Sequence, residues 1–470
     1  MLTKDQNQLL TRTGRGTPGG ALMRCYWQPV ALAEEIPFGA PPMPVKILSE
    51  ELVLFRDERD RLGLLGLYCS HRRADLSYGR IEDGGLRCLY HGWLYDISGR
   101  CLDQPAEAVG SCYKDEIRHL AYPVLERGGL VFAYMGNGEP PLLPSYEFLG
   151  AEPDHRYLVK TYLECNYLQG LEGDIDPAHL SFLHRSLRRR PLGRKDARTV
   201  PGSSVAAATL TRGDRRPQLE AERTDFGLRN YAIRDAADGQ RYVRINNFIM
   251  PNKVAAIGNE GRVSEGYTIH WRVPIDDENH VRFDFYFNRV RPVARERYEQ
   301  ELAAEVVDHR FRRNKRNRYL QDREQMRTGN FTGMGDFYSA QDAFAAESPG
   351  PIHDRTREHL GASDVCIVAA RRQLLTAIAD VKAGREPIHV IRDPTQDDMS
   401  HIVVVSEVIP PDTDHKALWK KRMHPSATGS RTPLPGNPSQ KQPARPPSVR
   451  GARSKRPRRV KSPGSSRSIP

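Results

Sequence analysis

Two short motifs that each pair a cysteine with a histidine constrain this chain more than any other feature of its sequence. The first is Cys69-Ser-His71, and Cys88-Leu-Tyr-His91 follows after sixteen intervening residues. A zinc finger usually takes two cysteines from one half of its site and two histidines from the other, so zinc fits this order poorly. One thiolate and one imidazole from each of two loops is typical of a [2Fe–2S] cluster in which two cysteines hold one iron and two histidines hold the other. The motifs therefore predict an iron–sulfur cluster rather than zinc or a chance grouping.

The sequence around both motifs predicts a β-rich domain. Residues 45–67 and 118–136 contain short apolar runs, most of them bounded by charged residues, proline or glycine, and this pattern is typical of short strands. Loops between such strands can present ligands, Gly92 would allow close backbone approach to the cluster, and Trp93 could shield it. We therefore expect an N-terminal domain over residues 1–145 that holds the cluster.

Residues 146–410 predict a second domain of the α+β class. A strand-like run at 281–287 occurs in the same region as candidate helices at 297–323 and 363–383. Such a mixture favours an antiparallel sheet flanked by helices. The segment 136–144, which is rich in proline and glycine, would link the two domains.

The formal charge of +12 lies almost entirely in the C-terminal segment. Residues 411–470 hold 15 Lys or Arg and two Asp or Glu, whereas the rest of the chain holds 56 basic and 57 acidic residues. The nearly neutral body gives no reason to expect nucleic-acid binding. From about residue 424 onward large apolar side chains are almost absent. Residues 411–470 are therefore expected to form a basic, disordered tail.

Composition also limits where the protein is expected to work. The chain has no run of 18 apolar residues, so no membrane-spanning helix is expected. Its polar start lacks the apolar core of a signal peptide, which favours a cytoplasmic location. Seven cysteines, an odd number in a long chain without a signal, argue against a disulfide framework.

A second group of candidate ligands opens the second domain, where Asp176, His179 and His184 follow one another closely. Five residues turn an ideal helix by about 500°, which leaves two imidazoles about 140° apart, so the histidines can converge only across a bend or a helix end. Two histidines and one carboxylate on one face of iron, with open positions opposite, suit O2 activation by non-haem Fe(II). Alternatively, Asp176 caps a helix that begins at Pro177, and the histidines are ordinary polar residues.

These motifs, with three further segments, make the chain resemble a known family. The further segments are Gly85–Trp93, Gln341-Asp342-Ala343 and Asp354–Gly361. Over about residues 1–405 the chain resembles the α subunits of the Rieske non-haem iron ring-hydroxylating oxygenases, and most of all the branch that includes phthalate dioxygenase. The resemblance implies an N-terminal Rieske domain with a [2Fe–2S] cluster and a C-terminal catalytic domain with a mononuclear Fe(II).

The resemblance also implies a role for each ligand. Two cysteines and two histidines would hold the cluster: Cys69, His71, Cys88 and His91. Two histidines and a distant aspartate would hold the mononuclear iron: His179, His184 and Asp342. By its residue type alone, that aspartate is equally a helix-start acid favoured by the macrodipole, and Asp336, Glu347 and Asp354 are nearby rivals.

Asp176 matches the bridging aspartate of the family. Such a carboxylate can accept N–H from two imidazoles, fix their tautomers and connect two metals. The resemblance pairs it with His179 on one side and with His91 of the partner subunit on the other. This arrangement requires a ring of subunits, so a homotrimer or a multiple of it is implied. The family commonly has Trp where Tyr167 stands, and we expect that change to affect packing rather than chemistry.

The implied activity is that of the oxygenase component of a multicomponent system. A separate flavin and iron–sulfur reductase would pass electrons from NAD(P)H to the cluster, and O2 would be the co-substrate. The product would be a cis-dihydrodiol, or a phenol if a leaving group departs or only one oxygen enters, as in monooxygenation or demethylation. Members of this branch often take aryl carboxylates or aryl ethers. A carboxylate needs a buried cation, for which Arg229, Arg234 and Arg244 on expected strands are candidates; alternatively, they form ordinary surface ion pairs.

Two other classes of protein remain to be weighed against an oxygenase. A Rieske-type electron-transfer protein without oxygenase activity would explain only about residues 40–140. It would hold two irons per chain, whereas an oxygenase would hold three. A nucleic-acid-binding protein would rest on the basic run 453–461 alone, and such a run is more often part of a solvated tail. A misread frame near the end of the coding sequence would also give such a segment.

Overall fold

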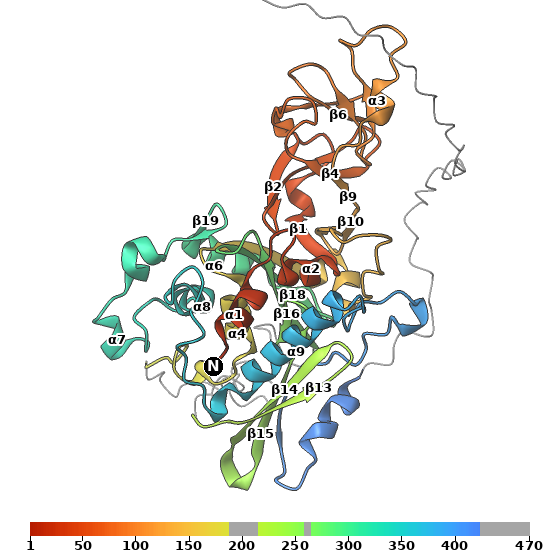
Figure 1. Ribbon diagram of the computed structural model, residues 1–470. Coiled ribbons are helices and arrows are strands. Elements are labelled where there is room, and N and C mark those ends of the chain that lie inside the picture. The colour runs from red at the N-terminus through yellow and green to blue at the C-terminus, as the bar shows by residue number, and fades with distance from the viewer. Residues whose placement is uncertain (188–214, 258–264, 424–470) are drawn as a thin grey trace, which may run out of the picture. The chain divides into compact units, whose positions relative to one another are not determined.

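The computed structural model describes residues 1–187, 215–257 and 265–423. These residues form three small sheets and one large sheet, with helices packed mainly against the large one (Figure 1). The α-helices are α1 (Lys4–Thr11), α2 (Pro18–Arg24), α3 (Tyr113–Glu116), α4 (Tyr167–Ile175), α6 (Arg295–Glu305), α7 (Gln325–Thr328), α8 (Tyr338–Glu347) and α9 (Val365–Lys382). This α+β architecture is the expected one.

Three antiparallel sheets form the N-terminal part. One contains β1 (Gln28–Leu32), β11 (Leu130–Ala133) and β10 (Val124–Arg127). The second contains β2 (Met43–Ile47), β3 (Glu50–Arg56), β4 (Leu62–Gly66) and β9 (Ala121–Tyr122), and the third β5 (Arg80–Glu82), β6 (Gly85–Arg87), β7 (Leu94–Tyr95) and β8 (Cys101–Asp103). We call the second and third sheets together the outer lobe, residues 43–122. The apolar runs of the sequence thus form short strands, as predicted.

The large sheet, which we call the main sheet, has ten strands. Its order is β13 (Gln218–Arg223), β14 (Gly227–Asp235), β15 (Arg241–Ile249), β16 (Lys253–Ala256), β17 (Gly266–Pro274), β18 (His280–Asn288), β12 (Arg156–Leu163), β20 (Arg310–Phe311) and β19 (Val306–Val307), with β21 (Val405–Ile409) paired to β15. All described pairings are antiparallel except that of β12 with β20. The predicted strand at 281–287 is β18.

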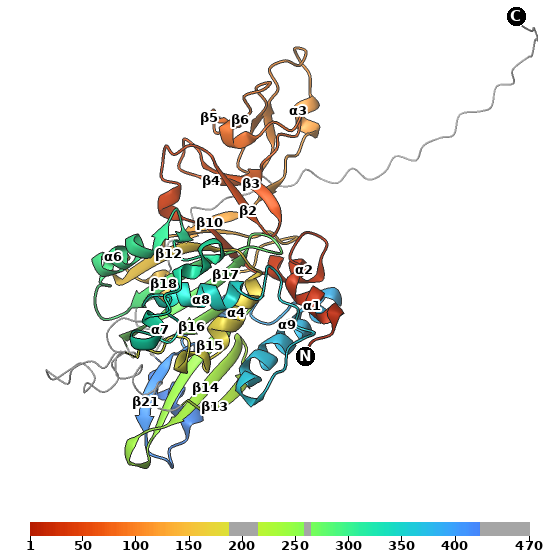
Figure 2. The same cartoon turned by 90° about the vertical axis from the view of Figure 1, so that its left-hand side faces the viewer.

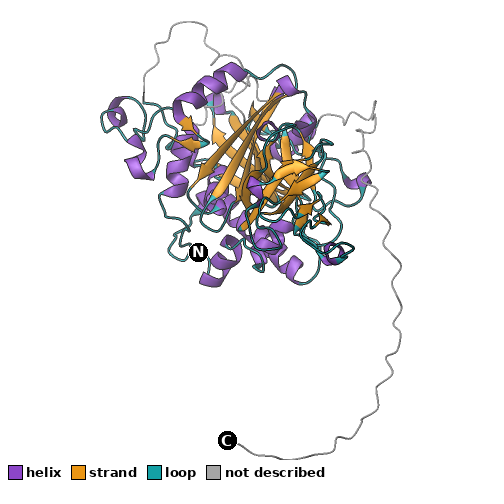
Figure 3. Ribbon diagram, turned by 90° about the horizontal axis from the view of Figure 1, so that it is seen from above, coloured by secondary structure: helices purple, strands orange, loops and turns teal. Residues whose placement is uncertain are grey.

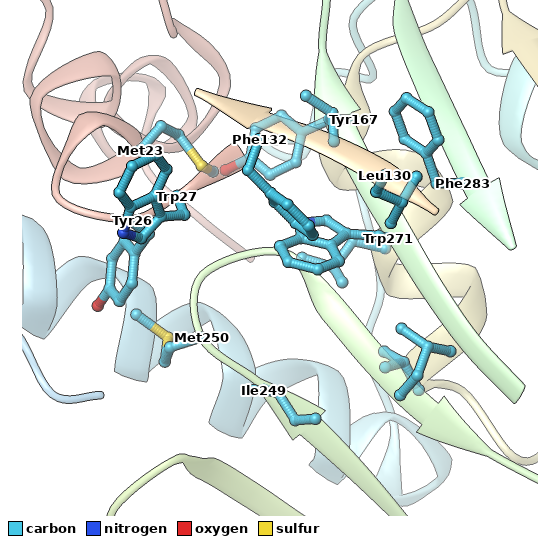
Figure 4. Close-up of a cluster of buried hydrophobic side chains, with 14 of the residues drawn as sticks. Met23, Tyr26, Trp27, Leu130, Phe132, Tyr167, Ile249, Met250, Trp271 and Phe283 are labelled. Atoms are coloured by element: carbon cyan, nitrogen blue, oxygen red, sulfur yellow. The ribbon is translucent and has the colours of Figure 1, made fainter. Parts of the chain in front are cut away.

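One hydrophobic core joins the N-terminal part to the main sheet. Leu130 and Phe132 of β11 lie against Trp271 and Phe283 of the main sheet, and the rings of Phe132 and Trp271 are 5.4 Å apart (Figure 4). Fully burying a side chain of this size contributes about 1.5–3 kcal/mol. The first sheet therefore packs directly on the main sheet.

Helices cover the main sheet where the second group of ligands lies. Helix α4 contacts β16 and β17, and α9 contacts β13 and β14 (Figure 2). Seen from above, helices lie around the strands (Figure 3). The predicted helix at 363–383 is α9. By contrast, the predicted helix at 297–323 ends at Glu305 as α6. The β-branched pair Val306-Val307 then forms β19, which pairs with β20, because such residues favour strands.

The N-terminal extension, expected within the first domain, packs instead on the helices of the second. Helices α1 and α2 both contact α9. The Tyr167 hydroxyl of α4 donates to the Leu10 carbonyl oxygen at 3.0 Å, and the Asn166 amide donates to that of Thr11 at 2.9 Å. A tyrosine at position 167 thus gains a packing partner, in line with the expectation for that position.

The structure also differs from the expected start of the tail at residue 411. His415–Arg422 form a 3-10 helix whose first turn is capped by Asp414. Leu418 is buried, and Trp419 stacks on the Arg229 guanidinium at 3.9 Å. The sequence did not indicate the buried roles of Leu418 and Trp419, because the segment around them is highly charged. The remainder of the expected tail, residues 424–470, lies outside the described residues. No helix within the described part is long and apolar enough to cross a membrane.

Two truncations are expected to behave differently. Deleting residues 424–470 should leave the melting temperature, the turnover rate and the oligomer size unchanged, because that sequence offers almost no apolar surface to bury. Deleting 411–470 should lower the melting temperature, since it removes the buried Leu418 and a contribution of about 1.5–3 kcal/mol. Calorimetry and size-exclusion chromatography measure both effects. Equal destabilisation by the two truncations would contradict this assignment.

Candidate metal centres

The two cysteine–histidine motifs lie in neighbouring loops of the outer lobe. Cys69 follows β4, and Cys88 follows β6. Both cysteines are buried, at 2% and 3% exposure, whereas His71 is exposed and His91 half-buried. The two imidazole rings lie 4.4 Å apart. The loops thus place two thiols on the inner side and two imidazoles on the solvent side of one site.

Local geometry holds the second loop in a tight turn. The Cys88 amide donates to the Trp93 carbonyl oxygen at 2.8 Å, and the Gly92 amide donates to that of Cys88 at 3.1 Å. Gly92 has a φ of +77°, and a Cβ there would lie 2.9 Å from Pro105 Cγ, so this turn requires glycine. The Trp93 ring stacks on His71 at 4.6 Å, nearly parallel to it. Trp93 therefore covers one face of the exposed imidazole.

This donor set fits a [2Fe–2S] cluster with two unlike ends. The thiol pair is buried and the imidazole pair faces solvent. Cysteine thiolates hold one iron of a Rieske cluster and neutral imidazoles the other. Burial lowers the pKa of His91, which favours the neutral ligand form. A cluster in this orientation would expose its histidine end.

The second group of ligands converges between α4, the short 3-10 helix His179–Ser181 and α8. His184 Nε2 lies 2.9 Å from Asp342 Oδ1, and His179 Nε2 lies 3.8 Å from the same oxygen. One ligand atom from each of the three residues lies within 4.8 Å of the others. A two-histidine, one-carboxylate set of this size fits one Fe(II) ion.

A break in the helix brings the two histidines together, as the spacing requires. Helix α4 ends at Ile175, Asp176 has extended backbone angles, and a single 3-10 turn begins at His179. Helix α4 is fixed in place by Glu172, which accepts hydrogen bonds from the buried Arg355 and Arg371. The segment 354–361, which the family resemblance includes, therefore contributes Arg355 to holding α4.

Two residues to which the sequence assigned no role orient His184. The Gln341 side chain donates to the Gly335 carbonyl oxygen at 2.6 Å, so its own oxygen faces His184 Nδ1 at 2.7 Å. Nδ1 must then carry the proton, which leaves Nε2 free to bind a metal. The Tyr338 ring stacks on the imidazole at 4.5 Å. Gln341 was visible in the sequence only as the neighbour of Asp342.

Asp176 was expected to be either a helix cap or a bridge between two imidazoles. In the structure it makes capping contacts, and it also lies near the imidazole of His179. Its Oδ1 accepts the Ala178 amide at 2.7 Å, and its Oδ2 accepts that of His179 at 3.3 Å. The same Oδ2 lies 3.7 Å from His179 Nδ1. That ring nitrogen is buried and has no hydrogen-bond partner within the described ranges. A small movement of the Asp176 carboxylate toward His179 would bring its Oδ2 within hydrogen-bond distance of Nδ1.

The surrounding charges favour the ionised form of Asp342. Burial alone would raise its pKa, but His184, His179 and the more distant Arg282 hold it well below the ordinary value. Its three rivals are engaged elsewhere: Asp336 accepts from Asn330, Glu347 from Tyr319, and the exposed Asp354 from Thr356. Among the described residues, only Asp342 joins the two histidines in a candidate metal group.

The structure separates the three candidate arginines. All three lie on strands of the main sheet, as predicted. Arg229 lies on the face that residues 403–419 cover. There it stacks on Trp419 and donates to the His401 carbonyl oxygen. Arg234 projects from the opposite face and donates to the Pro177 carbonyl oxygen at 2.8 Å, between Asp176 and His179. Arg244, opposite Ala232, shares the face of Arg234. Two of the three therefore face the iron ligands' loop.

Comparison with known proteins agrees with this geometry. The family model "Rieske [2Fe-2S] domain" matches residues 26–117, and the model "LigXa C-terminal domain like" matches residues 133–429. The "Phthalate 4,5-dioxygenase oxygenase subunit" of Pseudomonas putida is 38% identical over 83% of this chain and 89% of its own length. The "5,5'-dehydrodivanillate O-demethylase oxygenase subunit" of Sphingobium sp. is 33% identical over 88% of each chain.

Further relatives support the same family and fold. The "3-chlorobenzoate-3,4-dioxygenase oxygenase subunit" of Comamonas testosteroni is 32% identical over 80% of this chain and 88% of its own. The solved terminal oxygenase of carbazole 1,9a-dioxygenase from Nocardioides aromaticivorans shares the fold at 17% identity, with a TM-score of 0.52 over 81% of this chain and 97% of that one. An electron carrier would account for the outer lobe alone and leave the second domain unexplained. The chain therefore belongs to the Rieske non-haem iron oxygenases, in the phthalate dioxygenase-like branch, as an oxygenase subunit that uses a [2Fe–2S] cluster, mononuclear iron, O2 and reductase-supplied electrons.

Proposed function

We propose that this oxygenase subunit hydroxylates an aromatic carboxylate or aryl ether as a homotrimer or a multiple of it, with a separate flavin and iron–sulfur reductase that oxidises NAD(P)H in the cytosol. The observation that carries the proposal is the convergence of His179, His184 and Asp342 behind a helix break. The cluster would be held by the buried thiols and outward imidazoles of the outer lobe. When bound, the cluster supplies single electrons and Fe(II) with open positions activates O2.

Within this proposal, the protein's residues orient the ligands. The Gln341 oxygen keeps the proton of His184 on Nδ1, and the Asp176 carboxylate is placed to do the same for His179. The charge-assisted hydrogen bond from His91 of the partner subunit would occupy the other side of Asp176. The partial exposure of His91 in the single chain supports this, because a partner can reach it.

On the substrate side, one face of β14 and β15 offers buried polar groups. Asn230 is 3% exposed, and neither atom of its amide has a hydrogen-bond partner among the described residues. It lies opposite Asn246, whose oxygen is likewise unpaired there, on the face that also carries Arg244. Buried amides without partners are rare in native proteins and point to a missing polar ligand. Arg244 would pair with a substrate carboxylate, and Arg234 would position the Pro177 loop.

The names of several relatives favour this substrate class. They include a phthalate, a chlorobenzoate and a phenoxybenzoate dioxygenase, and an O-demethylase. Oxygen uptake with a matching reductase tests the proposal when it is screened over aromatic acids, over aryl ethers and over the same rings with neither group. Uptake coupled to product formation is expected only for the acids or ethers. Coupled turnover of the rings with neither group, and of no acid or ether, would overturn the substrate assignment.

The cluster ligands make a separate prediction. Purified protein should be red-brown and, after reduction, should show the EPR signal of a Rieske cluster with a low average g value. His71→Ala or His91→Ala should abolish that signal, because each removes one imidazole from the outer iron. The exposed His359 provides a control, and His359→Ala should leave the signal intact. A colourless protein that contains stoichiometric zinc would contradict the assignment of a [2Fe–2S] cluster.

A further inference from the structure

A histidine and an aspartate form a hydrogen-bonded pair on the main sheet, outside the ligand sets described above. His270 of β17 is directly opposite Asp284 of β18, and His270 Nδ1 lies 2.6 Å from Asp284 Oδ1. Asp284 is 3% exposed, whereas His270 is half-buried. Neither the metal sites nor the proposed substrate contacts give this pair a role.

The register of the sheet places His270 on the face that carries the unpaired amides. His270 projects from the same face as Asn246 and Arg244, because the register continues from β15 through β16 to β17 and side chains alternate between faces. The positions between them on that face belong to Ala256 and Thr268. Both side chains are small, so a substrate that contacts the amides has little side chain between it and His270.

Neighbouring charges place the pair close to the iron ligands. Burial would raise the pKa of Asp174, near the end of α4, but Arg272 and His270 lower it. Arg282, next to Asp284 on the same face of β18, is one of the groups that hold the pKa of the iron ligand Asp342 low. The pair thus lies within electrostatic reach both of α4 and, through Arg282, of α8.

Asp284 fixes the position of the imidazole proton. Burial would raise the pKa of this carboxyl, but Arg282 and His270 lower it to about 2, so it is ionised and can only accept. Arg282 Nε donates to the same Oδ1 at 2.6 Å. Although Arg282 also lies 3.0 Å from His270 Nδ1, the shorter contact with a carboxylate oxygen requires a proton on Nδ1. In the neutral imidazole Nε2 is then an acceptor, and it has no hydrogen-bond partner among the described residues.

We propose that His270 Nε2 accepts a hydrogen bond, and then the proton, from a hydroxyl group on the aromatic substrate, with Asp284 as its positioning residue. This deepens the proposed function and rests on it: the substrate is a phenol that also carries the carboxylate or ether group. In the transfer an O–H bond breaks, an N–H bond forms and no electron is gained or lost. Asp284 neutralises the imidazolium, and the phenolate ring, richer in electrons than the phenol, reacts more readily with an electrophilic oxidant.

The first test is isothermal titration calorimetry of the resting holoenzyme without reductase, so that binding is measured in the absence of turnover. The probes are benzoate and the three isomeric monohydroxybenzoates. At least one isomer should bind the wild type about tenfold more tightly than benzoate, because only the hydroxyl can donate to Nε2. In His270→Phe this preference should fall to about twofold or less, with benzoate affinity unchanged. His359→Phe, at an exposed histidine, is the control and should keep the preference.

A second measurement follows the proton itself. The nitro derivative of the preferred isomer has a phenolate that absorbs visible light, so its ionisation can be recorded on the enzyme by difference spectroscopy. Binding to the wild type should lower the pKa of the probe's hydroxyl. In Asp284→Asn the ratio of phenolate to phenol at a fixed pH should fall about tenfold, because the amide keeps the shape of the side chain but not the charge that stabilises the imidazolium. A role in packing alone would leave this ratio unchanged.

The remaining outcomes decide against the inference. It is overturned if no hydroxybenzoate binds the wild type better than benzoate. It is also overturned if His270→Phe weakens the binding of benzoate and hydroxybenzoate equally, as a role in folding or in carboxylate binding would do. If His270→Phe does not fold, the wild-type affinities and the Asp284→Asn ratio decide, and an unchanged ratio overturns it. Failure of the proposed function is distinguishable, because the wild type would then neither bind these acids nor couple oxygen uptake to any acid or ether.

Discussion

Replacing Asp176 by Asn is expected to abolish nearly all product formation while both metal centres and the trimer remain. Asn keeps the size of the side chain but loses its charge and one acceptor atom. It cannot accept N–H both from His179, whose Nδ1 lies 3.7 Å from the carboxylate, and from His91 of the partner subunit. Loss of a residue that orients a metal ligand typically costs 10–100-fold, and loss of the electron path should cost at least about that much.

The measurement separates a bridge from a cap. Asn caps helices about as well as Asp, and in this structure Asp176 does accept the Ala178 and His179 amides. If capping were its only role, Asp176→Asn would be nearly silent. In stopped-flow experiments, the variant's cluster, reduced beforehand, should stay reduced when substrate and O2 are added. Its EPR signal, iron content and elution volume should match the wild type.

A matched control tests the capping role by itself. Asp393 caps the 3-10 helix Pro394–Gln396 by accepting the Thr395 amide at 2.9 Å, in an exposed position. Asp393→Asn should leave turnover unchanged. If the cluster of the Asp176→Asn variant is reoxidised at the wild-type rate and product forms, Asp176 acts only as a helix cap.

Asp342→Ala is expected to remove one of three irons per chain and all coupled product formation. The substitution deletes the carboxylate that lies 2.9 Å from His184 Nε2 and 3.8 Å from His179 Nε2. Two imidazoles alone make a poor site for a hard ferrous ion. The Rieske EPR signal should persist, because the cluster ligands lie in the outer lobe. Iron analysis and EPR on the same sample distinguish the two losses.

The control for this substitution is the exposed rival Asp354, whose carboxylate accepts from Thr356. Asp354→Ala should keep three irons and near-normal turnover. Retention of three irons in Asp342→Ala, or their loss in Asp354→Ala, would show that the third ligand had been assigned to the wrong carboxylate.

The sequence predicted those parts of the site that depend on residue type and spacing. The alternation of Cys and His in two loops was enough to indicate a cluster, and the five-residue spacing of His179 and His184 required the break that follows Ile175. Asp342 came from family resemblance, since a ligand more than 150 residues away leaves no local signal. Gln341 was missed as a functional group because its role depends on a contact across the fold.

The fold was predictable where a local pattern decides it, as in β18 and α9. It was not predictable where packing between distant segments decides. The N-terminal helices pack against α4 through the carbonyl oxygens of Leu10 and Thr11, and no local pattern reveals this contact. Likewise, Trp419 stacks on Arg229 on the face of the main sheet that residues 403–419 cover. That contact helps to place a segment expected to be a tail. The alternation of side chains along β14 puts Arg229 on the face opposite to Arg234.

The most direct test of an oxygenase that acts on an aromatic substrate is transfer of labelled oxygen. The purified subunit, with a matching reductase and NAD(P)H, would turn over its best aromatic acid or ether from the uptake screen under 18O2, with the product analysed by mass spectrometry. We expect one or two 18O atoms in the product and none from labelled water in the dihydrodiol or phenol oxygen. Consumption of NAD(P)H and O2 with release of hydrogen peroxide, and no label in any aromatic product, would contradict it.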